Sequence, residues 1–76
     1  MNKTDKYTVY VLCRPGMFIN RFWVEGAGPK SRIVINVNRA HKFSDISIAK
    51  QIITLNKLVG FKVLAFNMRD YTLKAV

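Results

Sequence analysis

The stretch from Phe43 to Gly60, FSDISIAKQIITLNKLVG, decides the fold of this chain. Its apolar residues recur at helical spacing and fill about half of a helical wheel, as expected for a helix that lies on a sheet. Ser44 can cap the first turn, and Gly60 suits the left-handed position that ends many helices. The sequence therefore predicts one amphipathic helix over residues 44–59. The residues of its apolar half are Ile46, Ile48, Ala49, Ile52, Ile53, Leu55 and Val59.

Two residues of this helix do not fit the stripe. Leu58 lies outside it, and Asn56 is a polar side chain within it. Asn56 either bonds a backbone carbonyl or water at the rim of the core, which is the commoner arrangement, or contacts a ligand. We expect the helix to pack on the sheet through Ile48, Ile52, Leu55 and Val59.

Three segments before the helix are rich in β-branched and aromatic residues, which is typical of strands. Residues 7–13 and 17–24 flank the Arg-Pro-Gly sequence at 14–16, which favours a turn and so predicts a hairpin. Residues 31–38 alternate in polarity, as a strand with one face in water requires. The side chains of this third strand that we expect to face the helix are Ile33, Ile35 and Val37.

The chain after the helix continues as strand. Residues 61–66 are apolar on both faces except at Lys62, residues 67–70 favour a turn, and residues 71–76 form either a fifth strand or a tail. We predict an α+β fold, with an antiparallel sheet of three to five strands and one helix packed on one face, in the order β-β-β-α-β, with or without a last strand.

The length of 76 residues indicates a single domain over residues 1–76, with the polar residues 1–6 frayed. A domain of this size buries only about 60% of its unfolded surface, so its core is small. Cys13 is the only cysteine, which excludes an internal disulfide and fits a small buried residue in a strand.

The charge balance is the strongest feature of the composition. Thirteen Lys and Arg face four Asp and Glu, which gives a net charge of +9. This excess favours a polyanionic partner, with nucleic acid first and an acidic protein or a membrane surface second. No apolar run approaches the roughly 20 residues of a membrane span or resembles a signal peptide, so the sequence predicts a cytoplasmic protein.

The inventory of reactive side chains does not favour an enzyme. The four carboxylates, Asp5, Glu25, Asp45 and Asp70, are far apart in the sequence, which does not suggest paired acid and base groups. One His and one Cys do not fill a tetrahedral metal site, and no glycine pattern resembles a phosphate loop. We therefore expect no catalytic residue, no metal and no cofactor.

The open face of the sheet is the remaining candidate site. Placing Phe22 inward leaves Arg21 and Trp23 outward, which buries less charge than the opposite facing. Arg and Asn can bond base edges, and aromatic rings can stack on bases. A solvated face with Trp23 as a hydrophobic lid is an equally weighted interpretation. The predicted nucleic-acid-binding residues are Tyr10, Arg14, Arg21, Trp23, Lys30, Arg32, Asn36, Asn38 and Arg39.

The layout of three strands followed by one helix resembles the DNA-binding domains of phage and transposon integrases and the similar plant ethylene-response domains. The matching features are the turn at 14–16, the strand RIVINVN at 32–38 and the stretch AHKFSDISIAKQI at 40–52, within residues 7–59. In that family the sheet enters the major groove, which implies duplex DNA as partner. This chain departs from it by adding FKVLAF at 61–66 and lacks a recombinase domain.

The chain is also similar to small uncharacterised phage and prophage proteins, which implies an accessory role in the host cytoplasm. The leading hypothesis is a small DNA-binding accessory protein. The alternative is an interaction module that binds or inhibits a host protein through Trp23, Phe18 and a sheet edge. Convergence of Arg14, Arg21, Arg32 and Arg39 on one face would favour nucleic acid, whereas scattered arginines and a dominant apolar patch would favour a protein partner. The apolar segment 61–66 further predicts a homodimer through an edge strand.

Overall fold

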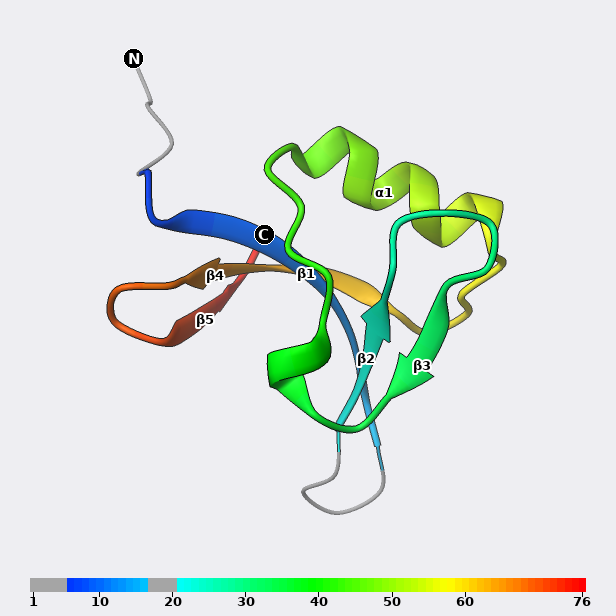
Figure 1. The fold of residues 1–76 in the computed structure, drawn as a ribbon, viewed down its shortest axis with the longest axis horizontal. Helices are drawn as coiled ribbons and strands as arrows, with labels where there is room; N and C mark the ends of the chain where they lie inside the picture. The colour runs from blue at the N-terminus through cyan, green and yellow to red at the C-terminus, as the bar shows by residue number, and fades with distance from the viewer. Residues whose placement is uncertain (1–5, 17–20) are drawn as a thin grey trace.

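The computed structural model describes residues 6–16 and 21–76, and it confirms the α+β fold (Figure 1). The last segment is a strand rather than a tail, so the order is β-β-β-α-β-β. The elements, with η1 a 3-10 helix, are β1 (Thr8–Pro15), β2 (Arg21–Glu25), β3 (Arg32–Val34), η1 (Val37–Arg39), α1 (Ile46–Leu55), β4 (Lys62–Asn67) and β5 (Thr72–Ala75). The first part of the predicted second strand, at 17–20, lies outside the described residues, as does Phe18.

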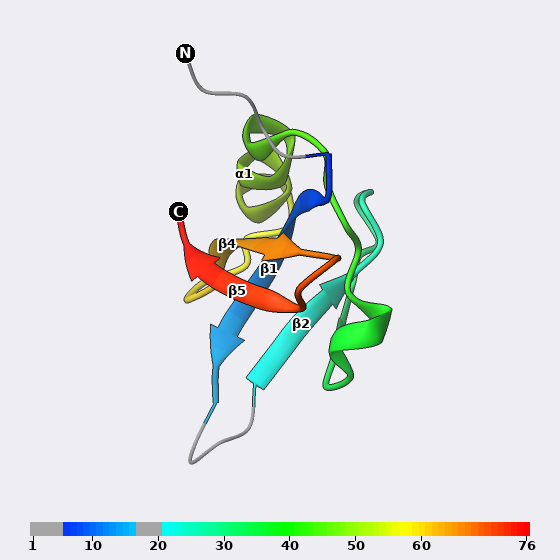
Figure 2. The ribbon, with the colours of Figure 1, turned by 90° about the vertical axis from the view of Figure 1, so that its left-hand side faces the viewer.

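The five strands form one antiparallel sheet in the order β3-β2-β1-β4-β5. β1 is central: its C-terminal end pairs with β2, from Cys13↔Trp23 to Pro15↔Arg21, and most of its length pairs with β4. In Figure 2, β4 and β5 run across the direction of β1 and β2, so the sheet is strongly curved. β4 lies between β1 and β5, which explains why residues 61–66 are apolar on both faces, and the edges of the sheet are β3 and β5.

One face of the sheet packs on α1 and forms the first core. From the helix, Ala49 and Ile52 are buried, and Ile46, Ile53 and the following Leu58 pack around them. The contacting stripe therefore includes Ala49, the smallest side chain of the helix and fully buried, and differs from the predicted one. Ile52 was therefore placed correctly, whereas Ile48, Leu55 and Val59 are exposed. The sheet and loop residues of this core are Leu12, Val24, Phe43, Phe61 and Val63.

The N-terminus of α1 is capped one residue later than predicted. Asp45, not Ser44, is the N-cap, and its Oδ1 accepts hydrogen bonds from the backbone N–H and the hydroxyl of Ser47, both at 2.8 Å. These bonds stabilise the ionised carboxylate and so lower the pKa of Asp45.

The C-terminus of α1 comes at Leu55 rather than at residue 59. The backbone N–H of Leu58 donates to the carbonyl of Ile53 at 3.0 Å, and that of Lys57 donates to Thr54 at 3.3 Å. These two bonds form a Schellman motif, with Lys57 at the left-handed position (φ 53°) where glycine is usual. Gly60 also has a positive φ, but it belongs to the turn that leads into β4.

Asn56 caps this end of the helix and ties it to a loop. Its Nδ2 donates to the carbonyl oxygen of Gly28 at 3.1 Å and to that of Ile52 at 3.2 Å. The side chain thus bonds backbone carbonyls at the rim of the first core, as in the first of the two interpretations above.

The opposite face of the sheet forms a second core instead of an open, wet surface. Here the prediction was wrong, because the curvature of the sheet folds the β4–β5 hairpin and η1 over this face (Figure 2). The described residues buried in it are Val11, Cys13, Trp23, Ala40 and Phe66. Val9, Val34, Val37, Leu64 and Leu73 pack against them.

The third strand is shorter than the predicted range 31–38. It ends at Val34, and Asn36 then caps η1 by accepting a hydrogen bond from the backbone N–H of Asn38 at 2.8 Å. Ile33 pairs with Val24 on the helix side, as predicted, but α1 does not cover it, and Ile33 and Ile35 are exposed. Val37 packs in the second core rather than toward the helix.

Candidate nucleic-acid interface

The concave face of the sheet carries two adjoining hollows that share Arg21 and Leu73, and we name the two together the concave groove. The larger hollow, of about 440 Å³, is lined by Arg21, Trp23, Val37, Asn38, Lys42, Phe66, Met68, Tyr71 and Leu73. The smaller hollow, of about 310 Å³, is lined by Cys13, Pro15, Arg21, Lys62, Leu64, Leu73, Lys74 and Ala75.

The floor of the concave groove is apolar and belongs to the second core. Trp23 is only 4% exposed and pairs with Cys13 on β1 and Val34 on β3. Burial raises the pKa of the Cys13 thiol, while the Arg21 guanidinium acts in the opposite direction. Because the raised pKa keeps the thiol protonated near neutral pH, the floor there is uncharged.

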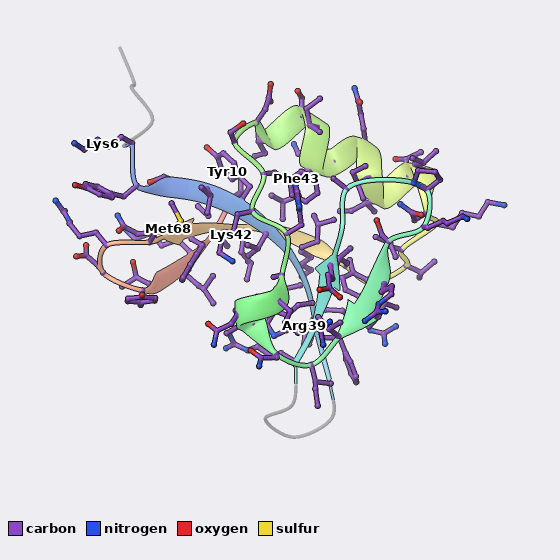
Figure 3. All side chains as sticks on the ribbon, viewed as in Figure 1. Lys6, Tyr10, Arg39, Lys42, Phe43 and Met68 are labelled. Carbon is purple, nitrogen blue, oxygen red and sulfur yellow. The ribbon has the colours of Figure 1, made fainter. Side chains whose placement is uncertain are left out.

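The rim of the concave groove is basic. Arg21 begins β2, Lys62 begins β4, Lys74 lies on β5, and Lys42 follows η1. None of the residues that line the two hollows is Asp or Glu. Figure 3 shows the Lys42 side chain extending into the space between η1 and the β4–β5 hairpin, where its Nζ donates to the carbonyl of Ala40 at 3.1 Å.

The carboxylates in the described ranges, 6–16 and 21–76, are all occupied elsewhere. Glu25 pairs with both Arg32 and Arg39, and Asp70 pairs with Arg69. Asp45 caps α1. Within these ranges the four rim cations form no ion pair, so their charge is available to an anion from solution.

The β4–β5 hairpin forms one wall of the larger hollow. Asn67 closes its turn, because its Oδ1 accepts hydrogen bonds from the backbone N–H groups of Arg69 at 2.9 Å and Asp70 at 3.0 Å. Met68 and Tyr71, on either side of these two residues, line the hollow. In Figure 3, Met68 lies on the hairpin side of the space that Lys42 enters.

The structure brings three of the predicted site residues into the concave groove: Arg21, Trp23 and Asn38. Arg21 and Trp23 face away from the helix as expected, with Phe22 on the helix side. Trp23, however, has too little exposed surface to stack on a base. Its role in the concave groove is that of a floor.

The other predicted arginines lie in different surroundings. The guanidinium of Arg14 lies over the rings of Phe22 and Phe61, with Cζ 4.9 Å and 5.2 Å from their centroids, on the helix side of the sheet. Arg32 contacts Glu25 at 3.3 Å, and Arg39 contacts it at 3.2 Å and 3.3 Å through two nitrogens. The four arginines therefore do not converge on one face.

The remaining predicted residues also lie outside the concave groove. Tyr10 is on the helix side and exchanges two backbone hydrogen bonds with Phe43, at 2.7 Å and 2.8 Å. Asn36 caps η1, and Lys30 is exposed in the loop between β2 and β3. These three residues have structural or solvent-facing positions instead.

The residues that sequence reasoning missed come from the C-terminal half of the sheet and from the segment after η1. They are Lys42, Lys62, Met68, Tyr71 and Lys74. Lys62 carried a signal, as the single polar position in an apolar strand. The others carried none, because their meeting with β2 depends on the curvature of the whole sheet.

No site for a metal was found: in residues 6–16 and 21–76, no three His, Cys, Asp or Glu side chains lie together as a metal would need. Neither helix in these ranges is long and apolar enough to cross a membrane. No protein-family model, curated protein or solved structure matches the chain.

Proposed function

We propose that the protein binds nucleic acid through the concave groove and acts as a small, non-enzymatic accessory protein. The observation that carries this proposal is the rim of Arg21, Lys42, Lys62 and Lys74, which surrounds an apolar floor and lacks any lining carboxylate. Phosphates are the anions that such a rim attracts, and the net charge of +9 adds a long-range attraction.

The resemblance to integrase-type domains supports the same surface. In that family, the sheet contacts DNA, and here the concave groove lies on the sheet face opposite α1. The similarity to small phage proteins supports an accessory role, in which the partner is nucleic acid in the cytoplasm of the host cell. The binding residues that we now propose are Arg21, Asn38, Lys42, Lys62 and Lys74.

A salt titration of binding tests this proposal. Anisotropy of labelled duplex and single-stranded oligonucleotides would be measured for the wild type and for the double variant Arg21→Gln/Lys42→Gln. Each phosphate contact contributes a slope of about −0.9 on duplex and about −0.7 on single strands in log affinity against log salt. The double variant should therefore bind more weakly, and its slope should be shallower by about 1.4 to 1.8.

The matched control is Lys30→Gln/Lys50→Gln, which removes two charges from exposed positions outside the concave groove. This control should keep the wild-type slope. An equal loss in both double variants would place binding elsewhere on the surface. Absence of binding to any nucleic acid at low salt would overturn the proposed function.

A protein-interaction module is the second candidate function, because several large apolar side chains are exposed. Ile35 is 78% exposed and Val59 is 84% exposed, and the sheet ends in two short edge strands, β3 and β5. Exposed apolar side chains and free edges are features of protein interfaces. This candidate includes a homodimer through an edge, and sedimentation that shows only monomer at high concentration would exclude the dimer.

A further inference from the structure

Tyr71 occupies an unusual position at the entrance of the larger hollow. It is 76% exposed and has a left-handed backbone conformation, with φ 57°. Its backbone N–H donates to the carbonyl of Asn67 at 2.7 Å, which fixes this conformation in the turn. Glycine and asparagine adopt such a backbone readily, whereas an L-residue with a large side chain is disfavoured there.

The turn does not explain a tyrosine at this position, and the core uses only a small part of its ring. Glycine would serve the turn better, and a side chain that is three-quarters exposed adds little to the core. The ring instead stands beside Phe66, with centroids 5.9 Å apart and planes tilted by 59°. Its exposed surface is therefore free to receive a flat apolar group at the mouth of the hollow.

From this geometry we propose that Tyr71 is a stacking platform for an unpaired base, so that the concave groove takes single-stranded nucleic acid in preference to duplex. This inference rests on the proposed function, and it replaces the duplex DNA that the integrase resemblance implies with a single strand. Aromatic rings stack on bases irrespective of sequence, but in a duplex the faces of the bases are covered by their neighbours. The cations that would meet the phosphates, Arg21 and Lys42, line the same hollow as Tyr71.

The size and continuity of the concave groove favour a strand over a free nucleotide. The larger hollow, of about 440 Å³, is within the range of sites that hold one small molecule, and so has room for a single nucleotide. Beyond Arg21 and Leu73 the smaller hollow continues with Lys62 and Lys74, where the phosphates of following nucleotides would lie. A strand uses both hollows, whereas a mononucleotide uses one.

The test uses substitutions of Tyr71 that distinguish the effect of its ring from the effect of its backbone conformation. Tyr71→Asn suits the left-handed conformation and removes the ring, and Tyr71→Phe keeps the ring. Affinities for an oligo(dT) strand, for a duplex of equal length and for a mononucleotide would be measured. We expect the wild type to bind the oligo(dT) strand more tightly than the duplex, and Tyr71→Phe to keep the wild-type affinity for the strand. Tyr71→Asn should bind the strand about 5- to 150-fold more weakly, which is the contribution of one stacked base.

The thermal midpoint distinguishes a binding role of Tyr71 from a structural role, and the salt slope tests the proposed function separately. Tyr71→Asn should leave the salt slope unchanged, since the ring carries no charge. It should change the thermal midpoint little, because relief of the left-handed backbone strain offsets the lost contact with Phe66. If Tyr71→Asn unfolds the protein, Tyr71→Gly is used in its place, and the same loss of affinity for the strand is expected. Unchanged affinity for the strand on loss of the ring, stronger binding to duplex, or equally tight binding of the mononucleotide would each overturn the inference. Salt-dependent binding in those cases would leave the proposed function intact.

Discussion

The two faces of the sheet are closed in different ways. On one face a separate element, α1, covers a core that contains Leu12, and a cation on that side, Arg14, lies over two aromatic rings. On the other face the sheet covers itself by curving, so the floor at Trp23 is buried while the rim at Arg21 stays exposed. Closure by curvature therefore places a core and the basic concave groove on the same face of the sheet.

The largest expected effect tests whether the concave face is a true core. Trp23→Ala should lower the free energy of unfolding by about 3–5 kcal/mol, because it removes a large side chain that is almost fully buried. Chemical denaturation followed by circular dichroism would measure it. A loss below about 1 kcal/mol would mean that this face is only a solvated surface, and the contrast between the two faces would disappear.

The next effect tests which stripe of the helix faces the sheet. Ile52→Ala should cost about 2–5 kcal/mol, since Ile52 is 6% exposed beneath α1. The matched control is Leu55→Ala on the same helix, where the side chain is 58% exposed and the expected change is within about 0.5 kcal/mol. Equal losses of unfolding free energy for Ile52→Ala and Leu55→Ala would mean that Leu55 also contacts the sheet, as the sequence predicted.

The smallest effect concerns the end of α1 and has the opposite sign. Lys57→Gly should raise the free energy of unfolding by about 1 kcal/mol, because Lys57 has φ 53° at a position that glycine adopts without strain. Lys50→Gly, inside the same helix, should instead cost about 1 kcal/mol. Thermal unfolding would compare the two variants, and a loss at Lys57→Gly would contradict the assigned cap.

The order of elements could be predicted because each depends on local signals. Runs of β-branched residues, the helical spacing of the apolar residues in α1 and the turn residues after β4 act over a few positions. The rotation of α1 could not be predicted from hydrophobicity alone. The pattern weighs Ile48 and Leu55 above Ala49, whereas close packing on the sheet favours the smallest side chain.

The candidate site was harder to predict because it depends on contacts between distant segments. Nothing local indicates that Glu25 holds both Arg32 and Arg39 and so removes them from a binding surface. The position of Lys42 opposite the β4–β5 hairpin likewise results from the curvature of the sheet (Figure 3). The charge of the chain favours a polyanionic partner, but it does not indicate which cations stay unpaired.

The central position of β1 has a consequence for how the chain folds. Its side chains alternate between the two cores, with Val11 in one and Leu12 in the other. Its main partner β4 lies near the other end of the chain, where Thr8 pairs with Asn67. Local pieces such as α1 and the β4–β5 hairpin can form early, but neither core can close before this long-range encounter, which sets a slow, cooperative step. Both faces of the sheet are then completed in the same event.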